Sequence, residues 1–114
     1  MEENTIQFGS KTYKTSGGFL CEFDSWDEDY SRGVAEQHSI TPDRDHRVVI
    51  RILREYYLEF GSLPPDIAVK KLYAKETGIS RDEAARKIKE LFPGGGIPLA
   101  RKIAGLPGPK HCCL

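Results

Sequence analysis

Apolar residues recur at helical spacing along most of the chain. From Trp26 onward they return every three or four positions, which is typical of helices with one buried face. The pattern predicts five helices. Their inward positions are Trp26, Tyr30 and Val34; Val49, Ile52, Leu53, Tyr56, Tyr57 and Phe60; Ile67, Val69, Leu72 and Tyr73; Ala84, Ile88, Leu91 and Phe92; and Leu99 and Ile103.

Capping residues predict where these helices begin and end. Ser25 and Glu28 form a capping box for a first helix over residues 26–37. Thr41 and Pro42 have the side chains of a second helix start. The other boundaries are Gly61 after the second helix, Pro64-Pro65 and Gly78 around the third, Ser80 with Glu83 and Pro93 around the fourth, and Pro98 and Gly105 around the fifth.

The residues before the first helix have the alternation of strands. Residues 5–15 read as a hairpin with a type II′ turn at Gly9-Ser10. Cys21 follows in a short apolar patch and is interpreted as a small buried apolar side chain. The fold class is therefore mainly α (α+β): a small orthogonal bundle of about five helices with an N-terminal β-hairpin, in one domain spanning residues 1–114.

Composition narrows the function classes. The chain has 114 residues and a formal net charge of zero, so it lacks the basic excess of a typical nucleic-acid-binding protein. No apolar run approaches the roughly 20 residues that span a bilayer. We expect a cytoplasmic protein with no cofactor and no membrane partner. The three cysteines do not make a disulfide framework, and cysteines in a reducing compartment are more often reactive or metal-binding.

The C-terminus carries the candidate chemistry. Pro107 and Pro109 remove backbone donors, so residues 105–114 are expected to form a mobile arm. Cys112 and Cys113 stand near its end, and an extended arm places them on the order of 27 Å from the body. A cysteine reacts as the thiolate, which the preceding Lys110 and His111 favour. We predict that one or both cysteines are the reactive groups.

Three other interpretations of these residues were weighed. The tail has the composition of an unstructured terminus without a role. A metal site at His111, Cys112 and Cys113 lacks the usual spacing of ligand pairs. The stretch from Val69 to Ile88 fits a helix-turn-helix with a turn at Gly78, so a DNA-binding regulator is an alternative function, although its alternating charges indicate a solvated face.

Several motifs together resemble the DsrC/TusE family of sulfur-relay proteins. They are Arg54-Glu55-Tyr56-Tyr57-Leu58-Glu59-Phe60-Gly61 followed by Pro64-Pro65, then Leu91-Phe92-Pro93, then Lys102-Ile103-Ala104-Gly105-Leu106-Pro107 and a nearly terminal cysteine. Gly18-Phe19-Leu20 and Trp26-Asp27 resemble the N-terminal half of the family. The similarity covers almost the entire chain.

The resemblance implies a sulfur carrier, rather than a stand-alone enzyme, that holds sulfane sulfur as a persulfide on an arm cysteine. The implied donor is a TusBCD-like or DsrEFH-like complex, and the implied acceptor a tRNA 2-thiouridylase or a dissimilatory sulfite reductase. A structural gamma-type subunit of sulfite reductase is a further alternative. Counted from the Gly105 motif the family cysteine is Cys112, and counted from the chain end it is Cys113. The second arm cysteine of the DsrC branch falls on Arg101, so the arm resembles TusE.

Overall fold

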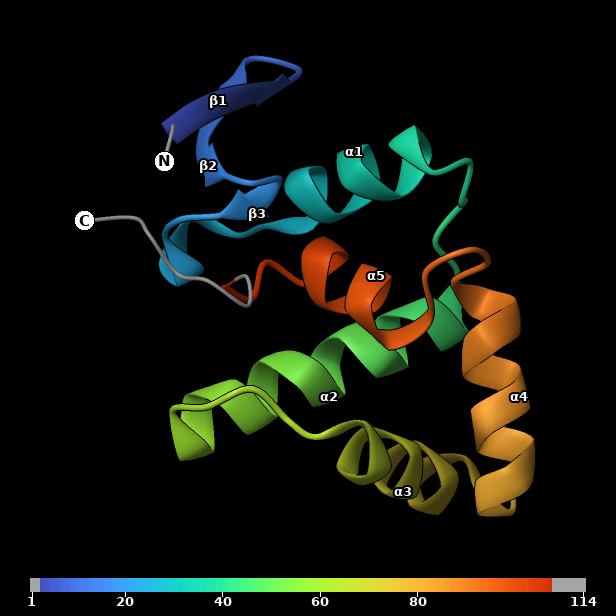
Figure 1. The fold of residues 1–114 in the computed structure, drawn as a ribbon. Helices are drawn as coiled ribbons and strands as arrows, with labels where there is room; N and C mark the ends of the chain where they lie inside the picture. The colour runs from blue at the N-terminus through green and yellow to red at the C-terminus, as the bar shows by residue number, and fades with distance from the viewer. Residues whose placement is uncertain (1–2, 108–114) are drawn as a thin grey trace.

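The computed structural model describes residues 3–107, with the side chains of residues 5–107 (Figure 1). Three strands precede five α-helices, and a short 3-10 helix, η1, connects the two parts. The strands are β1 Glu3–Phe8, β2 Lys11–Ser16 and β3 Phe19–Leu20; η1 is Phe23–Ser25; the helices are α1 Glu28–Gln37, α2 Arg44–Phe60, α3 Asp66–Thr77, α4 Arg81–Leu91 and α5 Gly96–Ile103. The predicted fold class is confirmed.

The N-terminal sheet is antiparallel in the order β1-β2-β3. Phe8 pairs with Lys11 across the predicted Gly9-Ser10 turn. Gly9 has a φ of 64°, as the first central residue of a type II′ turn requires. The strand β3, which the sequence had suggested only as an apolar patch, pairs with the end of β2 through Thr15 and Leu20.

The hairpin lies on α1. The Phe8 ring contacts the rings of Tyr13 and Tyr30 at centroid distances of 6.0 and 5.9 Å. It also covers Gly33, where an added Cβ would lie 2.3 Å from the ring. An isolated two-stranded hairpin is marginally stable in water, so this contact with α1 is what secures the sheet.

Asp27 connects the hairpin to the start of α1. Its carboxylate accepts hydrogen bonds from the Tyr30 amide at 2.9 Å, the Tyr13 hydroxyl at 2.6 Å and Lys11 at 3.0 Å. Burial raises the pKa of Asp27, but the hydrogen bonds from Tyr13, the Tyr30 amide and Lys11 outweigh it and lower the pKa to about 2. The predicted capping box at Ser25 is therefore wrong, because Asp27 caps the helix.

The start of α2 also differs from the prediction. The helix is capped by Asp43 rather than Thr41, and the Asp43 carboxylate accepts from the amides of Asp45 and His46. The His46 ring completes this cap because its Nδ1 accepts from the Asp43 amide at 3.1 Å. Its Nε2 lies 2.7 Å from the Leu91 carbonyl at the end of α4. A carbonyl can only accept, so Nε2 carries the hydrogen.

The helix α5 occupies the centre of the bundle and packs against α1, α2 and α4 (Figure 1). Its Ala100 and Ile103 are fully or almost fully buried. On α2 the predicted inward residues Val49, Ile52 and Leu53 are buried, but the prediction of burial fails at the end of this helix and at two positions of α3. The residues predicted to be inside that are instead exposed are Phe60 at 59%, Ile67 at 63% and Leu72 at 39%.

Substitution Gly33→Ala should destabilise the fold by about 1–3 kcal/mol, because the new methyl group overlaps the Phe8 ring. Denaturant unfolding at equilibrium measures this loss. Glu36→Ala, on an exposed position of the same helix, is the matched control. Equal unfolding midpoints for the two variants would show that the hairpin does not depend on this contact.

Substitution Asp27→Asn should lower stability near neutral pH and lose its effect in acid. The folded pKa of Asp27 lies below its ordinary value of 3.8, so the carboxylate stabilises the native state above that value. The contribution disappears as the pH falls from about 4 to about 2. Urea midpoints of both proteins across that range test the prediction, and a constant difference between them would contradict it.

Candidate functional site

The residues predicted to carry the chemistry, Cys112 and Cys113, lie outside the described residues, as do Lys110 and His111. Their role stays a prediction. The structure describes the segment from which they continue, namely the end of α5 and residues 105–107. How this segment is held decides where the cysteine-bearing tail starts.

Two carbonyl groups at the end of α5 are bound by side chains from distant parts of the chain. The Trp26 indole N–H donates to the Ile103 carbonyl at 2.9 Å, and Arg54 donates to the Ala104 carbonyl at 2.8 Å. Arg54 also donates to the Phe23 carbonyl at 3.2 Å. The last carbonyls of a helix have no partner within it, so these donors satisfy groups that would otherwise be buried unpaired. We call Trp26, Arg54, Ile103 and Ala104 the arm anchor.

The guanidinium of Arg54 is itself held by aromatic rings. Its central carbon lies 3.8 Å from the ring centroid of Phe23 and 4.2 Å from that of Trp26. Burial lowers the pKa of Arg54 from its ordinary value, while the charge of Asp24 acts in the opposite direction. An arginine remains charged through such changes. The anchor therefore has a fixed cation with several donors in one plane.

The chain after α5 turns back onto the body in a Schellman motif. The Gly105 amide donates to the Lys102 carbonyl at 3.2 Å, and the Leu106 amide donates to the Arg101 carbonyl at 3.1 Å. Gly105 has a φ of 73°, in the left-handed region that glycine adopts easily. The predicted role of Gly105 in ending the helix is confirmed.

Contacts of Gly105 and Leu106 place the start of the tail. A Cβ on Gly105 would lie 2.5 Å from the Trp26 ring and 3.1 Å from the Leu20 side chain. Leu106 is fully buried. Gly105 and Leu106, the first residues of the predicted arm, thus pack in the core.

Position 101, where the family resemblance suggested that a second arm cysteine could have stood, is an arginine that binds other parts of the fold. Arg101 donates to the Pro64 carbonyl at 2.7 Å and to the Asp66 carboxylate at 3.0 Å. Both partners lie at the start of α3. Arg101 therefore joins α5 to the start of α3. Among the described residues, Cys21 is the only cysteine.

Cys21 differs from its predicted role as a small buried apolar residue. It is half-buried and follows β3, with its amide bonded to the Lys14 carbonyl at 2.9 Å. It is disulfide-bonded. The apolar neighbours Phe19 and Leu20 suggested burial from sequence, whereas the strand ends at Leu20 and leaves Cys21 at its edge.

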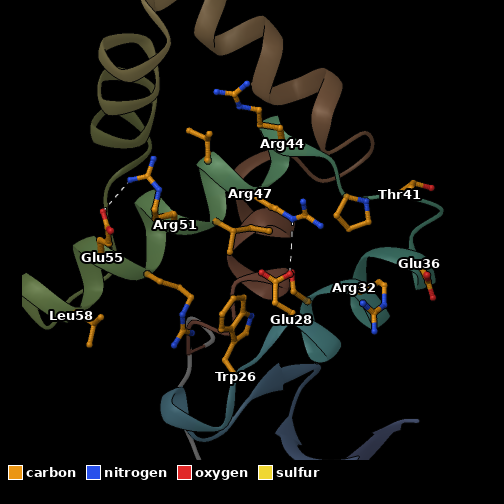
Figure 2. Close-up of a pocket in the computed structure, with 15 residues that line it drawn as sticks. Trp26, Glu28, Arg32, Glu36, Thr41, Arg44, Arg47, Arg51, Glu55 and Leu58 are labelled. Atoms are coloured by element: carbon orange, nitrogen blue, oxygen red, sulfur yellow. Dashed lines mark hydrogen bonds and ion pairs between the residues drawn. The ribbon is translucent and has the colours of Figure 1, made fainter.

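A cavity of about 630 Å³ lies between α1 and α2 (Figure 2). Arg44, Arg47, Arg51 and Arg54 reach it from one face of α2. Their spacing of three, four and three residues is the signal from which sequence reasoning could have found this face. Arg51 is paired with Glu55 at 3.3 Å, so the cavity has a mixed rather than a uniformly basic wall.

The predicted helix-turn-helix stretch forms α3 and α4, joined at Gly78 with a φ of 73°. Ala74 of α3 and Ala84 of α4 are buried, and the two helices contact each other. Lys87 lies 3.5 Å from Asp45 of α2. These contacts account for the spacing of small residues as helix packing, and DNA binding by this element stays an untested alternative.

The fold is that of a small helical protein with an N-terminal sheet, in which the arm anchor fixes residues 105–107, which we call the arm root. Sequence comparison identifies the family. A family model described as DsrC-like protein matches residues 7–113. The chain therefore belongs to the DsrC-like family. It is 34% identical over 104 residues to the sulfurtransferase TusE of Escherichia coli K12 and 35% identical to that of Salmonella typhimurium LT2. Both matches cover 91% of this chain and 94% of the relative.

Solved structures agree with this assignment. The oxidised gamma subunit of dissimilatory sulfite reductase (DsrC) from Archaeoglobus fulgidus superposes with a TM-score of 0.80 at 30% identity. DsrC from Allochromatium vinosum gives a TM-score of 0.82 at 26% identity. The alignments cover 96% and 97% of this chain and 99% of each of the two structures. The similarity extends over the entire fold, the arm root included.

Substitution Arg54→Lys should destabilise the protein by about 1–3 kcal/mol, since an ammonium group cannot keep both carbonyl bonds and the ring contacts. Arg51→Lys, one turn earlier on α2, makes the same chemical change at a more exposed ion pair and should cost far less. Equilibrium unfolding of the two variants measures the difference. Equal losses would show that the anchor is not a main support of α5.

Proposed function

We propose that the chain is a cytoplasmic sulfur carrier, which takes up sulfane sulfur as a persulfide on Cys112 or Cys113 and delivers it to a partner protein. The observation that carries this proposal is an anchored root followed closely by two thiols. Leu106 is fully buried, and Cys112 follows it by six residues. Such a tail extends up to about 20 Å from the root.

The transfer step is a thiol exchange. A tail thiolate attacks the outer sulfur of a donor persulfide, a new sulfur–sulfur bond forms on the tail, and the donor cysteine leaves as its thiolate. The acceptor removes the same sulfur by the reverse type of attack. No electrons are gained or lost overall, so the carrier needs no cofactor.

In this proposal the folded domain positions the tail and takes no part in the sulfur-transfer step. A donor and an acceptor must each receive the tail, and the anchor gives both the same starting point. Sulfurtransferase naming of the TusE relatives supports a relay, and the arginine at position 101 favours a TusE-like arm with one reactive end. On this proposal the donor is a TusBCD-like or DsrEFH-like complex. The acceptor is a tRNA 2-thiouridylase or, alternatively, a dissimilatory sulfite reductase.

Among the residues that the structure describes, helices are too short or too polar to cross a bilayer. The formal net charge of zero gives the chain no basic excess for nucleic-acid binding. We therefore propose protein partners, and neither a membrane nor a direct nucleic-acid contact, as the route of sulfur.

Incubation of the reduced protein with inorganic polysulfide should add one sulfur atom to the C-terminal peptide, as read by mass spectrometry without reductant. The variants Cys112→Ser and Cys113→Ser identify the carrying residue, because only one of them should lose the adduct. The double variant is the control and should gain none. A tail that stays unmodified while Cys21 gains sulfur would contradict the proposed function.

A further inference from the structure

Exposed apolar side chains gather on one part of the fold. In the described part of the chain, four large apolar side chains are exposed, and all of them come from the last turn of α2 or from α3: Leu58, Phe60, Ile67 and Leu72. The helical pattern predicted Phe60 and Leu72 to be inside. Because the core of a single chain does not use them, their apolar character indicates a contact with another molecule.

Two of these side chains line a groove of about 680 Å³ between α2 and α3, which contact each other (Figure 1). Phe60 and Leu72 share this lining with Ile52, Tyr56 and Ala68. The Tyr56 and Phe60 rings lie 4.5 Å apart between centroids, and Ile52 is buried beneath the surface. The groove therefore has an apolar floor that reaches the surface at Phe60 and Leu72.

The two walls of the groove carry opposite charges at the same spacing. Glu55 and Glu59 line it from α2, one helical turn apart, and Lys71 and Lys75 line it from α3, also one turn apart. Glu55 is paired with Arg51 at 3.3 Å. Within residues 5–107 no ion pair uses Glu59, Lys71 or Lys75. These three charges are therefore available to a partner.

An ion pair at the far end of the groove gives its register. Arg51, distant from the end of α2, is paired with Glu76, distant from the start of α3, so the two helices run in opposite directions. Five residues from this pair along each helix, Lys71 comes level with the stretch from Glu55 to Glu59. The acidic and basic walls thus carry their charges at corresponding positions along the groove.

We propose that a second copy of the chain occupies this groove, with α2 of each copy lying on α3 of the other. A two-fold axis parallel to the groove produces this arrangement, because it exchanges the two walls and keeps each position along the groove. The acidic wall of one copy then meets the basic wall of the other, with Glu59 close to Lys71. Phe60 and Leu72 of both copies are buried together in the centre, as in an isologous dimer contact.

This contact is separate from the arm anchor. Arg54 of the anchor and Tyr56 of the groove are two residues apart, which places them about 200° apart around α2. Arg54 binds the end of α5 on its own side of the helix. The inference therefore goes beyond the proposed function and does not depend on it.

Sedimentation velocity of the full-length protein should show a reversible dimer whose share rises with concentration. The contact is small, so we expect a Kd on the order of 100 μM, and samples should span about 10 to 500 μM. Reductant is present throughout, so that disulfides between chains do not contribute. Phe60→Ser should raise the Kd at least about tenfold, because it removes the central apolar ring. Leu58→Ser is the matched control, since Leu58 is as exposed but lines the cavity between α1 and α2.

Charge exchange tests which walls meet. Glu59→Lys and Lys71→Glu should each raise the Kd at least about tenfold, because like charges then face each other across the contact. An equimolar mixture of the two variants should associate as the wild-type protein does, since opposite charges face each other again in the mixed dimer. Glu36→Lys, the same charge change on an exposed position of α1, should leave the Kd unchanged.

Three results would overturn the proposal. The first is a protein that stays monomeric up to about 500 μM. The second is a dimer that Phe60→Ser and both charge variants leave unchanged, since another face would then form the contact. The third is a mixture of Glu59→Lys and Lys71→Glu that fails to associate although each variant alone is weakened. Unfolding midpoints close to that of the wild-type protein show that the variants, all at exposed positions, remain folded.

Discussion

The structure depends on how the carbonyl groups at the end of α5 are satisfied. The helix lies in the middle of the bundle, so its last carbonyls cannot turn to water, and burying them unpaired would cost free energy comparable to lost hydrogen bonds. Trp26 and Arg54 supply the donors from the η1–α1 connection and from α2. One small network therefore joins three parts of the chain and fixes the point where the arm leaves the body.

Local signals in the sequence were sufficient for most of the fold. Gly61, Gly78 and Ser80 mark helix boundaries correctly because capping is a local interaction. The two glycines adopt the left-handed backbone conformation that ends a helix, and the Ser80 side chain accepts from the Glu83 amide. The starts of α1 and α2 were misplaced because two capping residues stand close together at each. Tertiary partners select between them: Asp27 also binds Tyr13 and Lys11, contacts that no local pattern contains.

The candidate site likewise has parts that local sequence could predict and parts that depend on tertiary contacts. The tail with Cys112 and Cys113 stays a prediction from composition, whereas the motif around Gly105 was correctly recognised as a helix end. The anchor could not be, because Trp26 and Arg54 are separated by 77 and 50 residues from the carbonyls that they bind. Cys21 was misjudged because its apolar neighbours point to burial, whereas its exposure depends on where a two-residue strand ends.

The position of Arg101 constrains how an arm of this kind can evolve. Its side chain holds the Pro64 carbonyl and the Asp66 carboxylate, so a single replacement by cysteine would add a further thiol and at the same time remove both of these bonds between α5 and the start of α3. A cysteine at position 101 would therefore need another connection between α5 and the start of α3 to replace these two bonds.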